Sequence, residues 1–191
     1  MSVIEAITNF DFSVLYWIQE NLRSEFLDAV CRFLSISFEG GIFWFVVAAA
    51  LLIFRKTRTA GVMVIVSMGI VLLMGEFGLK NIFCRVRPCN IDTDVLLAIH
   101  RPSSYSFPSG HTGSSFAAAG AIFAYNKKLG IPALCVALLV GLSRMYLFVH
   151  YPTDVLAGMV LGLTVAFLVA FVFRKCDLDR RIQSIGRRQS A

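Results

Sequence analysis

The sequence predicts an all-α protein, a polytopic membrane bundle of five or six transmembrane helices with an interfacial helix at its N-terminus. Two features of the composition lead to this prediction. Of the 191 residues, 57% are hydrophobic and only 16% are charged, whereas a soluble domain has about 45–50% apolar and about 25% charged residues. The apolar residues are also gathered in long runs, which is typical of a chain that crosses a membrane several times.

The first 24 residues are predicted to form a helix that lies along the membrane interface. The opening segment MSVIEAITNFDF has neither the basic start nor the apolar stretch of a cleavable signal. Its pattern is amphipathic, and Tyr16 and Trp17 follow it, two side chains that favour the depth of the lipid headgroups. The sequence leaves open whether residues 1–39 contain a sixth span.

The predicted spans are runs close to the roughly 20 apolar residues needed to cross the hydrocarbon core. The run from Phe26 to Phe54 is interrupted by the segment SFEGG, so its span is expected to begin near Gly40. The five predicted spans cover residues 40–54, 60–83, 107–125, 131–149 and 152–173. Because no repeat or flexible linker separates them, we expect a single membrane-embedded domain over residues 1–191.

Basic residues predict the orientation, because Lys and Arg concentrate in the cytoplasmic loops of membrane proteins. The loops after the first and third predicted spans are basic, and so is the segment 174–191. The residues concerned are Arg55, Lys56, Arg58, Lys127, Lys128, Arg174, Lys175, Arg180, Arg181, Arg187 and Arg188. We therefore expect these loops on the cytoplasmic side, and a basic cytoplasmic tail that is solvated or bound to headgroups.

Other basic residues fall near the opposite ends of the spans and break this bias. Lys80 and Arg87 are seven residues apart, so the sequence places them on one helix face, and Pro88 should end that helix. Arg144 lies near the end of the fourth span, on the same predicted side as the segment FPSGH at 107–111. Three cations gathered in one place favour a ligand with several anionic oxygens, most naturally a phosphate.

The segment PSGH supplies a second anion-binding feature at the start of the third predicted span. Free N–H groups and the positive end of the helix dipole are expected around Ser109 and Gly110, where glycine lets the backbone approach a ligand closely. Two histidines, His111 and His150, suggest the roles of general acid and nucleophile. Asp154 lies four residues after His150, so it can hold one imidazole nitrogen and leave the other free to attack.

Three segments of the chain together resemble a known signature. They are Lys80-x6-Arg87-Pro88, then Pro108-Ser109-Gly110-His111, then Ser143-Arg144-x5-His150-x3-Asp154. Their order, spacing and residue types are similar to the three-part signature of the type 2 phosphatidic acid phosphatase and haloperoxidase superfamily. The resemblance covers roughly residues 75–160.

The resemblance implies a role for each signature residue. His150 would be the nucleophile that forms a phosphohistidine, Asp154 would be its partner, and His111 would protonate the leaving group. The phosphoryl oxygens would be held by Lys80, Arg87, Ser109, Gly110 and Arg144. The resemblance also implies that the reaction needs no metal and no other cofactor.

Three classes of function remain open from the residues. The first is a membrane lipid phosphatase that acts on a phosphomonoester or diphosphate lipid. The resemblance to small bacterial-type members of the superfamily suggests the lipid: undecaprenyl diphosphate is favoured, with phosphatidate or phosphatidylglycerophosphate as alternatives. The second is a phosphatase of a water-soluble ester, or a vanadate-dependent peroxidase, and the apolar spans disfavour a soluble peroxidase. The third is a helical bundle with a bare anion site, which the set of nucleophile, orienter and acid disfavours. The expected partners are the substrate lipid and membrane lipids, with no nucleic acid.

Other residues near the signature carry smaller expectations. Glu76 stands four residues before Lys80, so it is expected to pair with that lysine or with a neighbouring helix. His100 and Arg101 are expected in a solvated loop, and the role of Arg85 stays open. Free thiols are expected along the chain, although a disulfide between the cysteines at 84 and 89 is chemically possible.

Overall fold

The computed structural model describes residues 2–179 and residue 182. Within these residues all regular structure is helical, with no strand, which confirms the predicted all-α class. The elements are α1 (Val3–Asn21), α2 (Glu25–Ser37), η1 (Glu39–Gly41), α3 (Ile42–Ile53), α4 (Arg58–Leu72), η2 (Leu73–Leu79), α5 (Lys80–Phe83), α6 (Pro88–Ile91), α7 (Gly110–Tyr125), α8 (Lys127–Tyr146) and α9 (Pro152–Lys175). The element η1 is a 3₁₀ turn, and η2 is a π-helical stretch within a longer helix.

Three or four of these segments are long and apolar enough to cross a membrane. The three are Arg58–Ile91, Lys127–Tyr146 and Pro152–Lys175. A fourth is the pair Glu25–Ser37 and Glu39–Ile53, bent by 49°, so the predicted span 40–54 is only the second half of a broken element. In place of the predicted span 107–125, α7 has 16 residues, or about 24 Å of helix, which is short of the roughly 30 Å hydrocarbon core.

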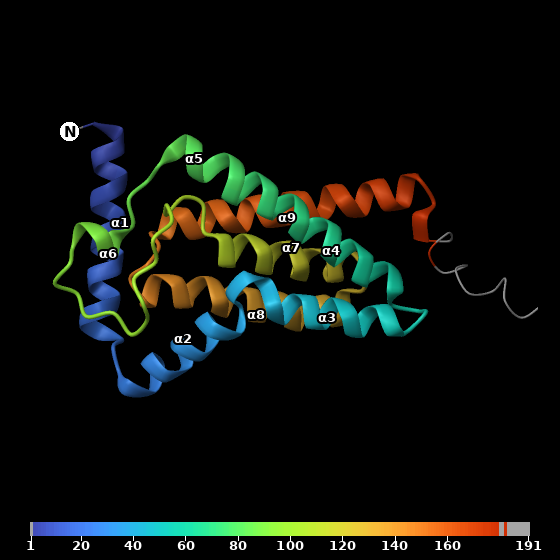
Figure 1. The fold of residues 1–191 in the computed structure, drawn as a ribbon, viewed down its shortest axis with the longest axis horizontal. Helices are drawn as coiled ribbons and strands as arrows, with labels where there is room; N and C mark the ends of the chain where they lie inside the picture. Colours follow the sequence, from blue (N-terminus) through green and yellow to red (C-terminus); the bar gives the residue numbers. More distant parts are fainter. Residues whose placement is uncertain (1, 180–181, 183–191) are drawn as a thin grey trace, which may run out of the picture.

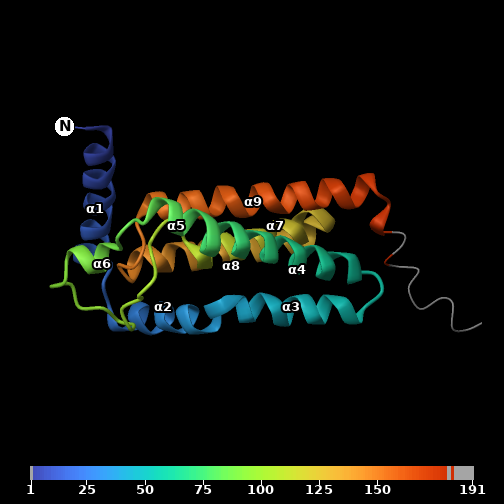
Figure 2. The same cartoon turned by 45° about the horizontal axis from the view of Figure 1, so that its top comes forward.

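The helix α7 lies inside the bundle and packs against α4, α8 and α9 (Figures 1 and 2). Small residues allow this packing because the helices approach at backbone distance. A Cβ added at Gly162 of α9 would lie 2.5 Å from the carbonyl oxygen of Gly113, and one at Gly158 would lie 2.7 Å from that of Ser109. The two glycines therefore let the first turns of α9 lie directly against the start of α7.

The two ends of the bundle differ. At one end α1 lies crosswise to the long helices, beside α6 and the loop that follows it (Figures 1 and 2). The starts of α7 and α9 and the end of α8 lie at this end, so all three signature segments meet there, in agreement with the prediction. The loop between α3 and α4 and the junction of α7 with α8, which carry the basic residues, lie at the opposite end.

The helix α1 corresponds to the N-terminal helix predicted for residues 1–24. Ser2 and Glu5 form a capping box at its start, which satisfies two N–H groups of the first turn. Its buried face includes Asp11, although burying a carboxylate is costly unless it is paired with donors or cations. Its other face exposes Phe10 and Trp17, as expected of a helix that lies at a membrane interface.

Lys80 and Arg87 do not share a helix face, and that prediction was wrong. The helix α5 ends before Cys84, which takes a left-handed conformation with φ of 45°, and Arg87 is extended where Pro88 opens α6. A residue before proline avoids the helical conformation, and here the break begins three residues earlier still. The two cations nevertheless converge, because both reach the hydroxyl of Ser104, Lys80 at 3.4 Å and Arg87 at 3.0 Å.

The described part of the predicted basic tail begins as the last turn of α9. Arg174 and Lys175 belong to that turn, and Nη2 of Arg174 donates to the carbonyl of Ala124 at 2.7 Å. The basic residues of the tail beyond this point, Arg180, Arg181, Arg187 and Arg188, lie outside the described residues. The solvated tail therefore stays a prediction.

Candidate active site

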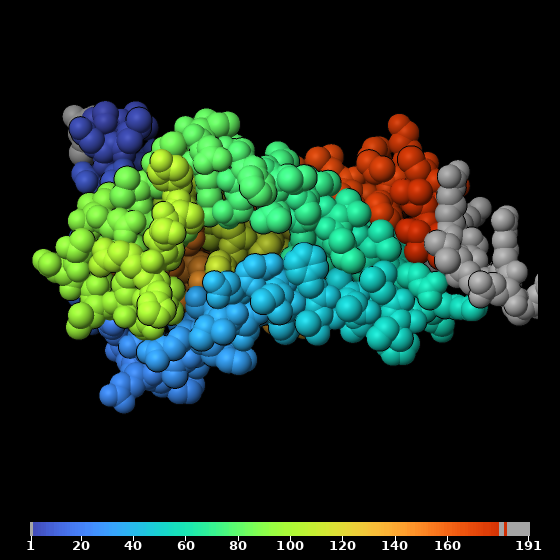
Figure 3. All heavy atoms as spheres, viewed as in Figure 1, coloured from blue at the N-terminus to red at the C-terminus, as the bar shows by residue number. Residues whose placement is uncertain are grey.

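A cavity of about 1150 Å³ opens at the end of the bundle where α1 lies. Figure 3 shows it as a hollow between α2, the loop that precedes α7, and the helix formed by α4 and η2. Seven predicted site residues line it: Lys80, Arg87, Ser109, Gly110, His111, Arg144 and His150. The eighth, Asp154, is fully buried next to His150. The fold thus brings the whole predicted site together.

His150 lies in the short loop between α8 and α9 and is 2% exposed. Its Nδ1 lies 3.5 Å from Oδ2 of Asp154 and 3.4 Å from Oγ of Ser106. Its Nε2 lies 2.9 Å from Nη1 of Arg87. Because a guanidinium only donates, Nε2 is the acceptor in this pair, and the ring proton is on Nδ1, facing Asp154. The nitrogen with the free electron pair therefore faces the cationic side of the cavity.

Asp154 lies in the first turn of α9, and three donors fix its carboxylate. The hydroxyl of Ser106 donates to Oδ2 at 2.5 Å, and the backbone N–H of Tyr151 donates to the same oxygen at 3.0 Å. On the other side, Nη1 of Arg85 donates to Oδ1 at 2.7 Å. This set of donors suits the carboxylate form, which only accepts hydrogen bonds, and it holds Oδ2 toward His150.

Burial lowers the pKa of His150 to about 4, because it disfavours the charged imidazolium. Asp154 opposes this effect and raises the pKa, whereas the positive charges of Arg87 and Lys80 lower it. The imidazole of His150 is therefore neutral near pH 7. This is the form that can attack through Nε2.

Arg87 is 4% exposed and is held almost entirely by neutral oxygen atoms. It donates to the carbonyl oxygens of Ser104, Tyr105 and Val149 at 2.7, 3.2 and 2.9 Å. These bonds join the loop before α7 to the loop before α9, so Arg87 fixes two parts of the site at once. In the described part of the chain, its hydrogen bonds go to carbonyl and hydroxyl oxygens and to the ring of His150.

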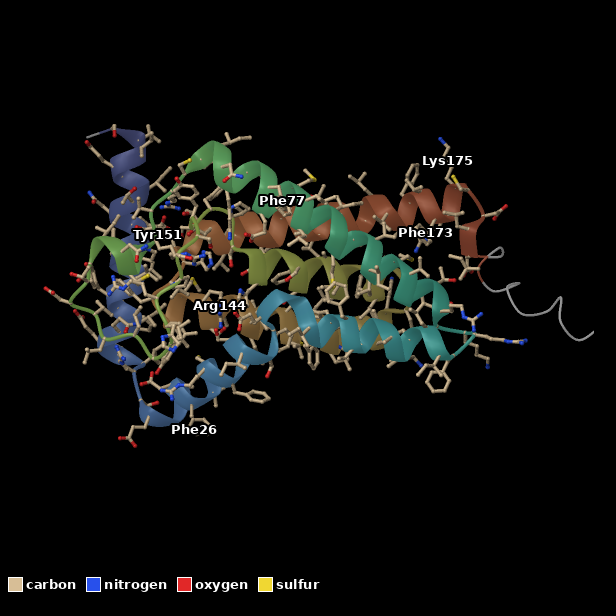
Figure 4. All side chains as sticks on the ribbon, in the orientation of Figure 1. Phe26, Phe77, Arg144, Tyr151, Phe173 and Lys175 are labelled. Carbon is tan, nitrogen blue, oxygen red and sulfur yellow. The ribbon has the colours of Figure 1, made fainter. Side chains whose placement is uncertain are left out.

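Arg144 and Lys80 are the other two buried cations, at 1% and 5% exposure. Arg144, labelled in Figure 4, donates to the hydroxyls of Ser35 and Ser143, both at 3.0 Å. Lys80 instead forms an ion pair of 2.7 Å with Glu76, which confirms the expected pairing. Among the ion pairs of the described residues neither arginine has a carboxylate partner, so both charges are available to an anionic ligand.

Ser109 occupies the N-cap position of α7, but its hydroxyl makes no capping bond to the backbone. The hydroxyl accepts instead from Oγ1 of Thr112 at 2.9 Å, and the Ser109 N–H donates to the carbonyl of Asp154 at 3.1 Å. The first-turn N–H groups of α7 thus remain available for an anion. A Cβ on Gly110 would lie 2.6 Å from Oε1 of Glu76, so that partly exposed carboxylate lies against the first turn of α7.

The imidazole of His111 lines the same cavity, one residue into α7. Its Nε2 is buried without a hydrogen-bond partner, a state that it shares in the described part of the chain only with Oγ of Ser67. The backbone of Ser35 is within hydrogen-bonding reach of the ring. Buried polar atoms are nearly always paired, so this nitrogen has hydrogen-bonding capacity to offer a group that enters the cavity.

A family model described as the PAP2 superfamily matches residues 57–177. The chain belongs to the PAP2 superfamily. The match includes every predicted site residue, from Lys80 to Asp154, and it confirms the resemblance drawn from the three segments.

Two curated PAP2 relatives show how far the likeness extends. The undecaprenyl-diphosphatase of Sulfolobus acidocaldarius is 37% identical over 126 residues, which cover 65% of this chain and 61% of that protein. The phosphatidylglycerophosphatase B of Bacillus subtilis is 37% identical over 136 residues, which cover 65% of this chain and 63% of that protein. The chain thus spans about six tenths of the length of these relatives.

A solved PAP2 structure agrees with the fold described here. The crystal structure of a transmembrane PAP2 type phosphatidylglycerolphosphate phosphatase from Bacillus subtilis matches with a TM-score of 0.72 and 30% sequence identity. The match covers 89% of this chain and 87% of that one. The fold is therefore shared by a transmembrane PAP2 type phosphatase of known structure.

Several residues that touch the PAP2 signature side chains were not predicted from the sequence. Ser104 and Ser106 bind Arg87 and Asp154, and a serine-rich run directly before FPSGH was the available signal. Ser35 reaches Arg144 from α2, more than one hundred residues away along the chain, so no local pattern could have identified it. Arg85, whose role stayed open, binds Asp154 as described above.

The remaining expectations near the PAP2 signature have mixed outcomes. His100 and Arg101 are exposed, as expected of a solvated loop, but both also line the mouth of the cavity. All five cysteines are free, including Cys84 and Cys89, which agrees with the expectation of free thiols. Within the described residues no group of three or more His, Cys, Asp and Glu side chains is placed to hold a metal ion.

Proposed function

We propose that the protein is an integral membrane lipid phosphatase that works without a metal, through a phosphohistidine at His150. The observation that carries the proposal is the divided lining of the cavity. Buried cations and two histidines form one part, and the other part is lined by apolar side chains: Ile36, Phe38, Phe45, Met68 and Leu72. A phosphorylated headgroup suits the first part, and a hydrocarbon chain suits the second.

The position of the opening supports a lipid substrate. In Figure 3 the hollow opens on the flank of the bundle, between α2 and the helix formed by α4 and η2, and not along the bundle axis. The surrounding surface exposes large apolar side chains, among them Ile36, Leu72 and Phe77. A lipid that stands beside the bundle can therefore enter sideways, with its chain leaving between these two elements.

In the first chemical step Nε2 of His150 attacks phosphorus. The new N–P bond forms as the P–O bond to the leaving group breaks, and His111 gives its proton to the departing oxygen. Lys80, Arg87, Arg144 and the first-turn N–H groups of α7 hold the phosphoryl oxygens and stabilise the charge that develops on them. Nη1 of Arg87, which donates to Nε2 of His150 in the free enzyme, turns to the phosphoryl group.

In the second step a water molecule attacks the phosphohistidine. His111 now accepts a proton from the water, the P–N bond breaks, and inorganic phosphate leaves with His150 neutral again. Asp154 accepts the Nδ1 proton of His150 as a hydrogen bond throughout and stabilises the positive charge on the phosphorylated ring. Every proton is returned, so the cycle needs no other reactant than water.

The favoured substrate is undecaprenyl diphosphate, with phosphatidylglycerophosphate and phosphatidate as alternatives. Support for the first comes from the relative named undecaprenyl-diphosphatase, and support for the second from the relative named phosphatidylglycerophosphatase B. A water-soluble ester remains the alternative of a different class.

Phosphate release by the purified protein in detergent tests these proposals. We expect a higher kcat/KM for at least one of the three lipids than for para-nitrophenyl phosphate. Release from none of them would overturn the phosphatase function, and a higher value for the soluble ester would favour the alternative class. EDTA should leave turnover unchanged, and vanadate, which resembles the transferring phosphoryl group, should inhibit competitively. A loss with EDTA that magnesium restores would disprove metal independence.

We also propose five membrane crossings with the site on the extracytoplasmic side. The three long spans and the bent pair count as four, and α7, enclosed by its neighbours, counts as the fifth. In a cysteine-free background, a single cysteine at Tyr105 should react with an impermeant thiol reagent in intact cells, and one at Lys127 should not. The reverse pattern would invert the orientation and the cytoplasmic placement of the C-terminus.

A further inference from the structure

Asp11 is a buried carboxylate on α1 that no signature segment contains. It has no exposed surface, and three donors surround it. Nη2 of Arg85 donates to its Oδ2 at 2.6 Å, the N–H of Thr153 donates to Oδ1 at 3.1 Å, and the Thr153 hydroxyl donates to Oδ2 at 2.5 Å. This set of donors suits the carboxylate form, which only accepts hydrogen bonds, so Asp11 places a negative charge in the interior, on a helix that also packs through apolar residues such as Leu15 and Ile18.

Arg85 connects this charge to the carboxylate beside the nucleophile. Its Nη2 binds Asp11, while its Nη1 donates to Oδ1 of Asp154 and to Oγ1 of Thr153, both at 2.7 Å. The guanidinium carbon also lies 3.9 Å above the ring centre of Tyr151, a residue that Figure 4 shows beside α1. Two carboxylates and an aromatic face thus hold the planar fork of Arg85 in one orientation.

This arrangement divides the two oxygens of Asp154 between two tasks. Oδ1 binds Arg85, and Oδ2 remains for Ser106 and Nδ1 of His150. If the charge of Asp11 were absent, the guanidinium would be drawn more strongly onto Asp154 and would compete for both oxygens. A ring that is held less well in its attacking orientation reacts more slowly, since a small misplacement of a reacting group can lower the rate about 100-fold.

We propose that Asp11 and Arg85 are positioning residues that hold Asp154, and through it His150, in the orientation for attack, so that α1 completes the active site. The inference rests on the proposed phosphatase function. It gives α1 a role beyond contact with the membrane interface. It also accounts for a buried carboxylate on this helix, because simple docking of α1 needs only the apolar contacts of residues such as Leu15 and Ile18.

If Asp11 and Arg85 act through their charges, changing them should shift the pH dependence of kcat/KM, whereas a loss of packing alone should not. The groups that face His150 are Asp154, Arg87 and Lys80, together with His111 across the cavity. An Arg85→Gln variant changes none of these groups. It removes the positive charge that partly neutralises Asp154, so Asp154 stabilises a protonated His150 more strongly and the pKa of His150 rises. The acid limb of the profile, which is the fall of kcat/KM at low pH as His150 becomes protonated, should therefore move to higher pH by about one pH unit.

The opposite shift is expected when the other end of the bridge is changed. Asp11→Asn leaves the charge of Arg85 less neutralised, and the field of Asp154 at His150 becomes weaker. The acid limb should then move to lower pH, and a move to higher pH would contradict the proposal. Opposite responses of two residues in direct contact would not follow from a general loosening of the fold.

The decisive assay measures hydrolysis of para-nitrophenyl phosphate, a soluble ester whose binding does not depend on the apolar part of the cavity. Asp11→Asn and Arg85→Gln should each lower kcat by about 10- to 100-fold with little change in KM. The double variant should lose less than the product of the two single losses, because the residues act through one contact. Glu20→Gln, an exposed acid on the same helix, is the matched charge control and should keep wild-type kcat.

A second control separates positioning from stability. Leu15→Ala, at a fully buried position of α1, should lower the melting temperature in detergent without moving the acid limb. If Asp11→Asn does not fold, Arg85→Lys tests the same bridge, since a lysine cannot bind both carboxylates in a fork.

The outcomes separate the inference from the function on which it rests. If the wild-type protein releases no phosphate from any ester, the proposed phosphatase function itself is disproved. An active wild type whose Asp11→Asn and Arg85→Gln variants keep kcat on the soluble ester would overturn the inference alone. A loss confined to lipid substrates would also overturn it, because it would assign α1 to substrate entry.

Discussion

Both ends of the described bundle carry basic side chains, but only the α1 end buries several of them. At the end where α1 lies, Lys80, Arg87 and Arg144 are 5%, 4% and 1% exposed. At the other end Lys56 and Lys128 are exposed. Exposed cations keep their hydration or meet lipid headgroups, whereas a buried cation needs several fixed partners to replace the water that it loses.

The difference lies in the partners. At the α1 end serine hydroxyls and backbone carbonyls surround the two buried arginines without neutralising them. These arginines have lost their water and have no carboxylate partner among the ion pairs of the described residues, so their positive potential favours the binding of an anionic ligand. The exposed end has no such need, so its lysines are expected to affect orientation in the membrane and not catalysis.

The largest expected effect is the loss of the proposed nucleophile at the α1 end of the bundle. His150→Ala removes the attacking nitrogen, so turnover should fall on the order of 10⁴-fold or more on every substrate, whatever its leaving group. Phosphate release with a lipid and with para-nitrophenyl phosphate measures this loss. Vanadate binding and the melting temperature serve as controls for folding. Recovery on the activated ester would show that another group attacks.

A smaller, substrate-dependent effect is expected for His111→Ala. General acid catalysis contributes about 10²–10⁴-fold, and a lipid alkoxide needs this help, whereas a nitrophenolate leaves without a proton. The variant should lose on the order of 10²–10⁴-fold on a lipid monophosphate and much less on para-nitrophenyl phosphate, with a diphosphate lipid in between. An equal loss on all three substrates would contradict the role of His111 as the acid.

The comparison of the two ends can be tested by removing one cation from each. Arg144→Gln should lower kcat by about 10²–10³-fold, because it removes charge-stabilising donors from the transition state. Lys128→Gln, at an exposed position, should change kcat by less than about twofold, as surface substitutions usually do. The ratio of the two effects on one substrate is the measurement. Similar losses would mean that the buried end has no special role.

The smallest expected effect concerns the acid limit of the reaction. In the proposed mechanism only the neutral imidazole of His150 can attack, and burial lowers its pKa from the ordinary 6.5 to about 4. As the pH falls, kcat/KM should therefore decline through about pH 4 and not through about pH 6.5. The profile is measured after correction for the ionisation of the substrate. A limb near the ordinary value would mean that His150 is more solvated than its 2% exposure indicates.

The sequence predicted the fold class and all the cavity-lining signature residues because both depend on local features. Apolar runs of a given length indicate membrane helices, and the residue types at 108–111 and 143–154 indicate phosphoryl chemistry. Errors arose where the local rule was ambiguous. The spacing of Lys80 and Arg87 suited one helix face, but the chain leaves the helix at Cys84. The segment SFEGG did indicate the break near residue 38, but the sequence did not show that Glu25–Ser37 and Glu39–Ile53 form one bent element.

The sequence by itself determined the helical class, the residues of the predicted site and the resemblance to the PAP2 superfamily, because residue type and spacing are properties of the chain. Only the tertiary structure decided which neighbours complete the site. Asp11 and Ser35 come from helices more than one hundred residues away from their partners Thr153 and Arg144. Contacts at such separations depend on how closely α7 and α9 approach and on where α1 crosses the bundle. Those positions follow from the packing of the whole chain, so no local pattern could give them.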